Sequence, residues 1–335
     1  MNWRMLGLAA LTVVALTGCT GGDSGANSTE SKTSSGAGGE FKVALLTVGP
    51  VSDAGWNAMA YDALQGIKSE MNATVDNQEA PPSKAKDAMR AYAQKGYQLV
   101  FGHGFEYNEP GAAVAGDFPD TVFISSSGGK TAPNAGAFRF YLEQGFYLAG
   151  MMAGKMSKTG KIGSVAVLNI PSINSTIKAY EAGAKAANPN IKIIPTVYFG
   201  TEGDIAGAKR ATESILGQGA DFVIHQANSA AKGVFDACAE KKANAFGSNL
   251  NQNDQAGVIG SAIINAKPAF LDLAKRVQAK EFKGEIVLVG MDKDAIDFVI
   301  NPARESEIPA DVKQVVDDTR KKIRAGELTV PKDEF

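Results

Sequence analysis

The chain has 335 residues, with 34 basic and 36 acidic side chains and a formal net charge of −2 at pH 7. This near balance leaves no basic stripe, so we exclude a nucleic-acid partner. The length is sufficient for two lobes of ordinary domain size.

Residues 1–18 have the composition of an export signal. Arg4 precedes an apolar run from Leu6 to Leu16, which is long enough for a signal-peptide core but too short to cross a bilayer. The run ends Leu16-Thr17-Gly18-Cys19, which resembles a bacterial lipobox, in which the cysteine is acylated, commonly with palmitate, and becomes the mature N-terminus. The alternative is an ordinary secretory signal followed by an incidental cysteine.

Residues 19–40 contain mostly small and polar side chains, and they bury too little apolar surface to fold. We expect a flexible tether that holds a globular body at the extracytoplasmic face of a cell membrane through the lipid on Cys19. Cys238 is then the remaining thiol, which excludes an intrachain disulfide and predicts a small buried residue in a helix.

From Phe41 onward, short apolar runs alternate with amphipathic ones, which predicts an α/β fold with largely parallel sheets. We predict strands over Lys42–Val48, Gln98–Gly102, Thr121–Ser125, Lys161–Val167, Lys192–Tyr198, Asp221–His225, Ala243–Ser248, Val258–Ile264 and Glu285–Val289. Helical periodicity appears over Ala54–Met71, Ser83–Lys95, Leu142–Met156, Ile173–Ala187, Asp204–Gly217, Ala230–Lys241 and Ala310–Ala325. We expect an N-terminal lobe of 41–145 plus about 258–284, and a C-terminal lobe of 146–257 plus about 285–335.

No pattern of catalytic residues is found. The chain has no G-x-S-x-G turn, no complete dinucleotide loop and no Walker-type loop. The two histidines, His103 and His225, lack partners at metal-ligand spacing, and each is more typical of a structural residue. We therefore expect no catalytic residue, metal or cofactor, and predict that the protein is not an enzyme.

Polar and aromatic side chains gather after several predicted strands, where open α/β sheets bind their ligands. The candidate ligand contacts are Ser52, Asp53, Trp56, Asn57, Phe105, Glu106, Tyr107, Asn108, Asn228, Asn249 and Asn251. The set contains rings, amides and carboxylates but no positive charge. It suits a neutral, planar ligand with polar edges, because rings can stack on its faces while amides and acids bind its edges.

Each candidate also has a purely structural interpretation. Asp53 can be the N-cap of the helix that follows, with Ser52 as a competitor. Trp56 can pack in the core from the first turn of that helix. The asparagines can reflect turn chemistry.

An ordered series of motifs resembles one known family, the basic-membrane-protein or PnrA-like substrate-binding lipoproteins of ABC transporters. The series covers most of residues 41–290, and as an ordered set it is specific. Its members are Asp53-Ala54-Gly55-Trp56-Asn57 with Gly66, Phe118–Phe123, Glu143–Gly150, Lys158–Gly163, Tyr180–Lys185 and Gly219–Asp221.

The resemblance implies a type I periplasmic-binding-protein fold, in which two doubly wound parallel-sheet lobes are joined by a hinge and close on a purine nucleoside or base. It also implies an ABC permease and ATPase subunits as partners, and we expect a monomer. Asp53, Trp56 and Asn57 match the family's first ligand loop, and Phe105 to Asn108 fall in the second.

Two departures from the family pattern bear on the ligand. Gly247–Gln252 replaces an acidic loop of the family's nucleoside binders, and Ile264 stands where these carry a lysine that contacts the ribose. The missing lysine shifts the expectation toward a free base or another small heterocycle. Two other functions stay open: a ligand-sensing lipoprotein that signals to a membrane partner, and an extracytoplasmic nucleoside hydrolase.

Overall fold

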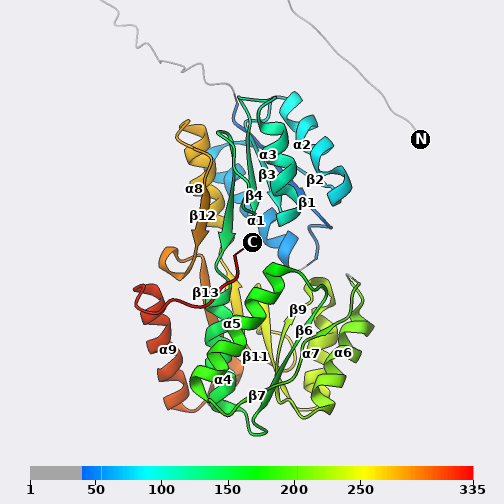
Figure 1. The fold of residues 1–335 in the computed structure, drawn as a ribbon, viewed down its shortest axis with the longest axis vertical. Coiled ribbons are helices and arrows are strands. Elements are labelled where there is room, and N and C mark those ends of the chain that lie inside the picture. Colours follow the sequence, from blue (N-terminus) through cyan, green and yellow to red (C-terminus); the bar gives the residue numbers. More distant parts are fainter. Residues whose placement is uncertain (1–39, 54, 202, 335) are drawn as a thin grey trace, which may run out of the picture. The chain divides into compact units, whose positions relative to one another are not determined.

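A computed structural model describes residues 40–53, 55–201 and 203–334 of the chain (Figure 1). The expected signal peptide, Cys19 and all of the tether except Glu40 lie outside the described residues. No helix in the described ranges is both long enough and apolar enough to cross a membrane.

Six strands of the first sheet run parallel in the order β12-β5-β4-β3-β1-β2. Their bounds are β1 (Lys42–Thr47), β2 (Thr74–Glu79), β3 (Leu99–His103), β4 (Val122–Ser126), β5 (Ala135–Phe140) and β12 (Ile286–Val289). Helices α1 (Trp56–Met71) and α8 (Ala266–Gln278) cover one face, while α2 (Ala85–Gln94) and α3 (Asn108–Ala115) cover the other (Figure 1). Helices on both faces explain why these strands are buried on both sides.

The second sheet has the order β13-β11-β10-β9-β6-β7, with β8 also paired to β6. Its strands are β6 (Lys161–Ala166), β7 (Lys192–Ile193), β8 (Val197–Tyr198), β9 (Phe222–Gln226), β10 (Asn244–Asn249), β11 (Val258–Ile264) and β13 (Ile296–Ile300). All neighbours are parallel except β13, which runs antiparallel to β11. Its helices are α4 (Glu143–Met156), α5 (Pro171–Ala187), α6 (Ile205–Gly217), α7 (Ala231–Glu240) and α9 (Ala310–Arg324).

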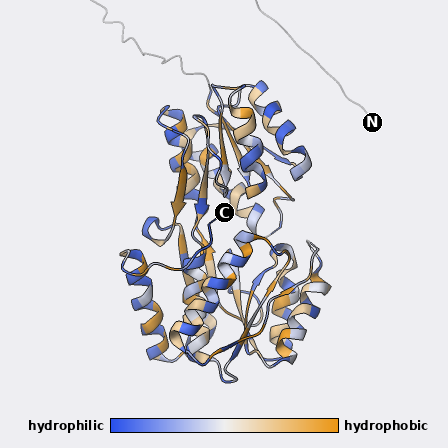
Figure 2. Cartoon of the chain, in the orientation of Figure 1, coloured by the Kyte–Doolittle hydropathy of each residue, from blue (hydrophilic) through white to orange (hydrophobic). Residues whose placement is uncertain are grey.

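Apolar residues concentrate on the strands and on the inward sides of the helices (Figure 2). Between α1 and the first sheet, the core contains Leu45, Leu64 and Phe101, each at most 1% exposed. The same cluster continues through the second sheet beneath α4 and α5. Cys238 is fully buried in α7 and forms no disulfide, as predicted for a small core residue. Burial raises the pKa of its thiol to about 12.

The chain passes between the two sheets three times among the described residues: between β5 and α4, between β11 and α8, and between β12 and β13. The expected lobe boundaries were therefore wrong at two strands. β11 belongs to the second sheet, although we placed 258–284 in the N-terminal lobe, and β12 belongs to the first sheet, although we placed 285–335 in the C-terminal lobe. The helix α8 packs against α1, which covers the first sheet.

Candidate ligand-binding site

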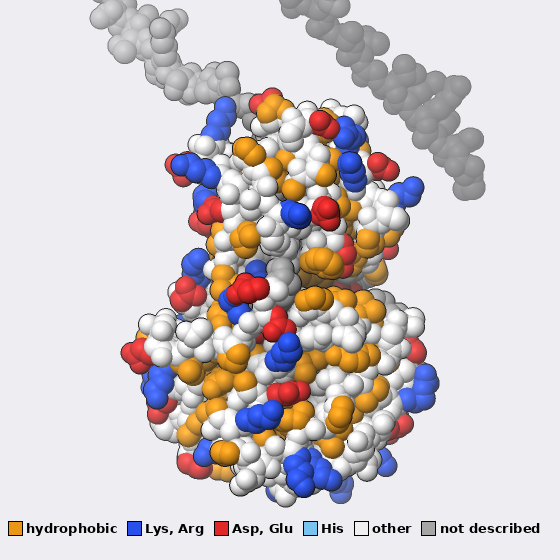
Figure 3. Space-filling view, in the orientation of Figure 1, with side chains coloured by type: hydrophobic (Ala, Val, Ile, Leu, Met, Phe, Trp, Pro, Cys, Tyr) orange, Lys and Arg blue, Asp and Glu red, His pale blue; other side chains and the backbone are white. Residues whose placement is uncertain are grey.

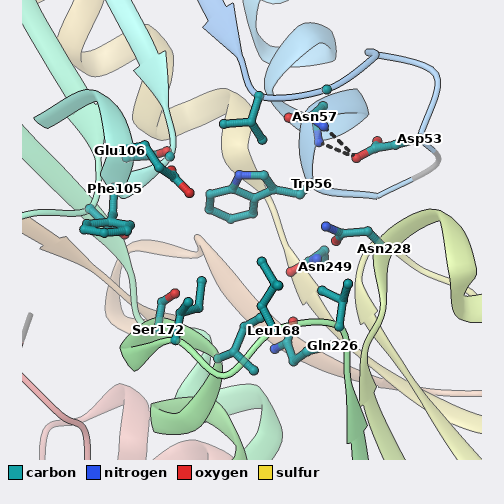
Figure 4. A pocket seen from close by; sticks show the side chains of 18 of the residues that line it. Asp53, Trp56, Asn57, Phe105, Glu106, Leu168, Ser172, Gln226, Asn228 and Asn249 are labelled. Carbon is teal, nitrogen blue, oxygen red and sulfur yellow. Dashed lines mark hydrogen bonds between the residues drawn. The ribbon is translucent and has the colours of Figure 1, made fainter. Parts of the chain in front are cut away.

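A cavity of about 660 Å³ lies where the carboxyl ends of strands from both sheets meet. The molecule is hollowed there, and apolar side chains border the hollow (Figure 3). Seven of the predicted ligand contacts line this cavity: Asp53, Trp56, Asn57, Phe105, Glu106, Asn228 and Asn249 (Figure 4). Such a volume is typical of sites for small molecules.

The carboxylate of Asp53 holds the first turn of α1 in place. Its Oδ1 accepts from the backbone N–H groups of Gly55 (3.0 Å) and Ala58 (2.9 Å). Its Oδ2 accepts from the backbone N–H (2.9 Å) and the Nδ2 (3.1 Å) of Asn57. A carboxylate has about four acceptor positions, so Asp53 is saturated by the protein. The N-cap residue of α1 is Gly55 and not Asp53 as predicted, although the Asp53 carboxylate does bind the backbone of the first turn. Ser52 is exposed outside the cavity lining.

Asn57, which is only 5% exposed, is fixed by Asp53 through its amide nitrogen, whereas its Oδ1 has no hydrogen-bond partner among the described residues. Buried acceptors are rarely left without a donor. Asn57 is also among the residues that line the cavity.

Trp56 projects into the cavity from the start of α1 (Figure 4). The ring of His103 at the end of β3 stacks on it, with 4.0 Å between centroids and 21° between planes, and Phe140 meets it edge-on. His103 Nε2 donates to the carbonyl of Trp56 (2.9 Å), and Ser126 donates to Nδ1 (2.9 Å). Burial lowers the pKa of His103 to about 3, so the ring is neutral and supports Trp56.

The loop after β3 divides between the cavity and the core. Phe105 is 48% exposed and lines the cavity with Glu106, whereas Tyr107 is fully buried and donates its hydroxyl to the carbonyl of Ala80. Asn108 is also turned away and holds the loop at Lys130 (2.7 and 3.0 Å). The prediction that Tyr107 and Asn108 belong to the site is therefore not supported by their position.

The asparagines of the second sheet combine turn geometry with a place in the cavity. Asn228, just after β9, and Asn249, at the end of β10, have left-handed backbones with φ of 43° and 66°. Asparagine tolerates this conformation better than most residues, so turn chemistry accounts for the residue type. Both line the cavity, whereas Asn251 is exposed outside it and accepts from the backbone of Asn253.

The second sheet contributes an apolar wall of Val167, Leu168, Ile170, Ile173 and Ile264. All but Ile264 are absent from the residues that the sequence singled out. The wall residues follow β6 or end β11, so the strand-end rule could have found them. Ile264 lies at the position where the family resemblance placed a lysine.

An ion pair also lines the cavity, and it adds a positive charge that the predicted set of contacts did not contain. Arg139 of β5 pairs with Glu143 of α4, and their side chains are 8% and 2% exposed. Burial raises the pKa of Glu143, although Arg139 and Ser175 oppose this. Arg139 is the sole cation in the described lining, against the four carboxylates of Asp53, Glu79, Glu106 and Glu143.

Rings, amides and an excess of carboxylates can together bind a neutral planar molecule, whereas an anion would meet like charges.

His225, the other histidine, is buried in β9 and bonds to Gln252 outside the cavity lining. Among the described residues, no three His, Cys, Asp or Glu side chains gather closely enough to hold a metal ion.

The chain was compared with known protein families, curated proteins and solved structures. The family described as "ABC transporter substrate-binding protein PnrA-like" matches residues 41–334. The chain is 25% identical to the purine-binding protein of Brucella abortus, over 86% of this chain and 82% of that protein. It is 27% identical to the ABC transporter nucleoside-binding protein BmpA of Lactococcus lactis subsp. cremoris, over 99% of both. A solved ABC transporter solute-binding protein from Conexibacter woesei superposes with a TM-score of 0.69 at 25% identity, covering 87% of this chain and 99% of that one. The expected type I periplasmic-binding-protein fold is thus confirmed, and the chain belongs to the family of PnrA-like ABC transporter substrate-binding proteins.

Proposed function

We propose that this substrate-binding protein captures a neutral, purine-like solute in the cavity between its two sheets and delivers it to an ABC permease. We also propose that the lipid on Cys19 anchors it at the extracytoplasmic face of the membrane. The three chain crossings form the hinge, and closure draws its free energy from contacts that a ligand makes with both sheets at once.

The observation that carries this proposal is the environment of Trp56. One face of its ring is covered by His103, the ring projects into the cavity, and the amide of Asn57 is among the lining groups. A purine offers a flat face for the indole and N–H donors at its edge for the amide. The names of the purine-binding and nucleoside-binding relatives point the same way.

Charge and the apolar wall narrow the ligand further. Four carboxylates line the cavity together with a single guanidinium that is already paired, so a phosphate group would be repelled. The side chain of Ile264 cannot bond to a ribose hydroxyl, and burying such a hydroxyl without a partner is costly. A free base such as hypoxanthine or adenine therefore fits better than its nucleoside, and a nucleotide fits worst.

Isothermal titration calorimetry of the purified protein with hypoxanthine, adenine, inosine and AMP tests the proposal. Binding of at least one base or nucleoside with a dissociation constant in the micromolar range or below is expected, with none for AMP. Trp56→Ala should weaken binding by about tenfold or more, since stacking on one aromatic ring contributes roughly 1–3 kcal/mol. Tyr97→Ala, which removes a ring of the same lobe outside the cavity lining, is the control. Absence of purine binding, or equal effects of the two variants, would refute the proposal.

A further inference from the structure

Residues 328–334, which follow α9, run back from the second sheet to the level between the two sheets (the dark red end in Figure 1). We call this segment the strap. Val330 inserts into the shared core and is only 1% exposed, and the hydroxyl of Tyr141 donates to its carbonyl. Tyr141 lies just after β5, in the first crossing between the sheets. The strap therefore contacts the hinge.

A closed ring of hydrogen bonds joins the strap to the cavity wall. Arg139 Nη1 donates to the carbonyl of Asp333 (2.6 Å), and the N–H of Asp333 donates to Ser175 Oγ (2.9 Å). The Ser175 hydroxyl donates to Glu143, which also accepts from Arg139.

The ring connects parts of the molecule that the hinge separates. Arg139 ends a strand of the first sheet, whereas Ser175 belongs to α5, which packs against the second. Arg139 and Glu143 line the cavity, but neither Ser175 nor the strap does. Both charges are at least nine-tenths buried, so their positions depend on satisfied partners. The exposed pair between Lys178 and Asp333 adds little.

We propose that the strap positions Arg139 and Glu143 at the cavity wall and ties the β5–α4 crossing to α5. Ligand affinity and the mobility of the hinge are then set in part by a segment that does not line the cavity. The positioning residues are Asp333, through its backbone, together with Ser175 and Tyr141.

Hydrogen–deuterium exchange of the full-length, ligand-free protein tests the strap directly. Tyr141→Phe removes one hydroxyl that binds the strap, and Ser175→Ala opens the ring. The matched control is Tyr198→Phe, which also removes a single tyrosine hydroxyl bond, that to Asn174 on the surface. Both strap variants should exchange several-fold faster in 139–145 and 328–334, with α7 unchanged. Rates equal to the control, or faster exchange spread evenly over the chain, would overturn the proposal.

A second arm measures coupling to the cavity and rests on the proposed function. Titrated with hypoxanthine, Tyr141→Phe and Ser175→Ala should bind several-fold more weakly, whereas Tyr198→Phe should bind as the unmodified protein does. Unchanged affinity in both strap variants would remove the positioning role. If hypoxanthine binds none of the proteins, the functional proposal fails for this base while the exchange result still decides whether the strap restrains the hinge.

Discussion

Replacing Asp53 with alanine is expected to cost the protein more stability than the loss of an ordinary helix cap. The carboxylate is 7% exposed and accepts four hydrogen bonds. Three of its donors are the backbone N–H groups of Gly55, Asn57 and Ala58 at the start of α1. Alanine would leave all of them without this acceptor.

The magnitude follows from how buried these donors are. Loss of a typical N-cap costs about 1 kcal/mol. A buried donor left without a partner costs roughly 1–3 kcal/mol, and Gly55 and Asn57 are both buried. Allowing for relaxation of the turn, we expect Asp53→Ala to lower the free energy of unfolding by about 3 kcal/mol.

Urea unfolding measures this effect, and the chain offers a matched control. Asp204 caps α6, but its side chain accepts one backbone N–H, that of Gly207 (2.7 Å), and is 34% exposed. Asp204→Ala should cost about 1 kcal/mol. If Asp53→Ala proves no more destabilising than Asp204→Ala, the capping argument is wrong and the Asp53 carboxylate is available to a ligand.

Three further predictions concern pH, the buried ion pair and the ligand. Burial lowers the pKa of His103 to about 3 and that of His225 to about 4. The unfolded chain therefore binds more protons than the folded protein below about pH 6.5. The free energy of unfolding should fall as the pH is lowered from 7 to 5, by about 2 kcal/mol for each histidine. A loss of unfolding free energy in His103→Phe as large as that in the unmodified protein would contradict this. Glu143→Gln should lower the free energy of unfolding in urea by about 3 kcal/mol, because it leaves Arg139 buried beside a neutral group. The control is Glu240→Gln, which removes one charge of an exposed ion pair and should lower that free energy by less than about 1 kcal/mol. Ile264→Lys should raise the affinity for inosine relative to hypoxanthine by about tenfold, since a hydrogen bond to a charged group contributes roughly 1.5 kcal/mol. An unchanged ratio of the two affinities in calorimetry would count against a position of residue 264 that faces the ribose.

The strands that could be predicted are those whose burial shows in the sequence. Val258–Ile264 is mostly apolar and interrupted only by Gly260 and Ser261, and its predicted bounds match β11. The polar sequence of β2, Thr74–Glu79, carries no such signal, because it is an edge strand whose side chains are largely solvent-accessible. β5 was missed because Arg139 interrupts it, and its buried partners, Glu143 above all, explain why a charge is tolerated there.

The candidate site was predictable where ligand geometry follows from strand ends, and not where it depends on side-chain direction. Trp56 and Asn249 follow strands and reach the cavity. Phe105 and Tyr107 share one short 3₁₀ helix, yet one faces the cavity and the other the core, which the sequence does not distinguish. The sequence also did not predict which sheet β11 and β12 each join, because the three crossings between the sheets are short and resemble ordinary loops.

The most direct test of the central claim is a calorimetric titration of the intact protein with hypoxanthine and AMP in parallel. The carboxylate-rich, aromatic cavity predicts a dissociation constant in the micromolar range or below for the neutral base and no measurable binding of the nucleotide. Binding of AMP with equal or greater affinity would contradict the claim that this cavity selects a neutral purine-like solute.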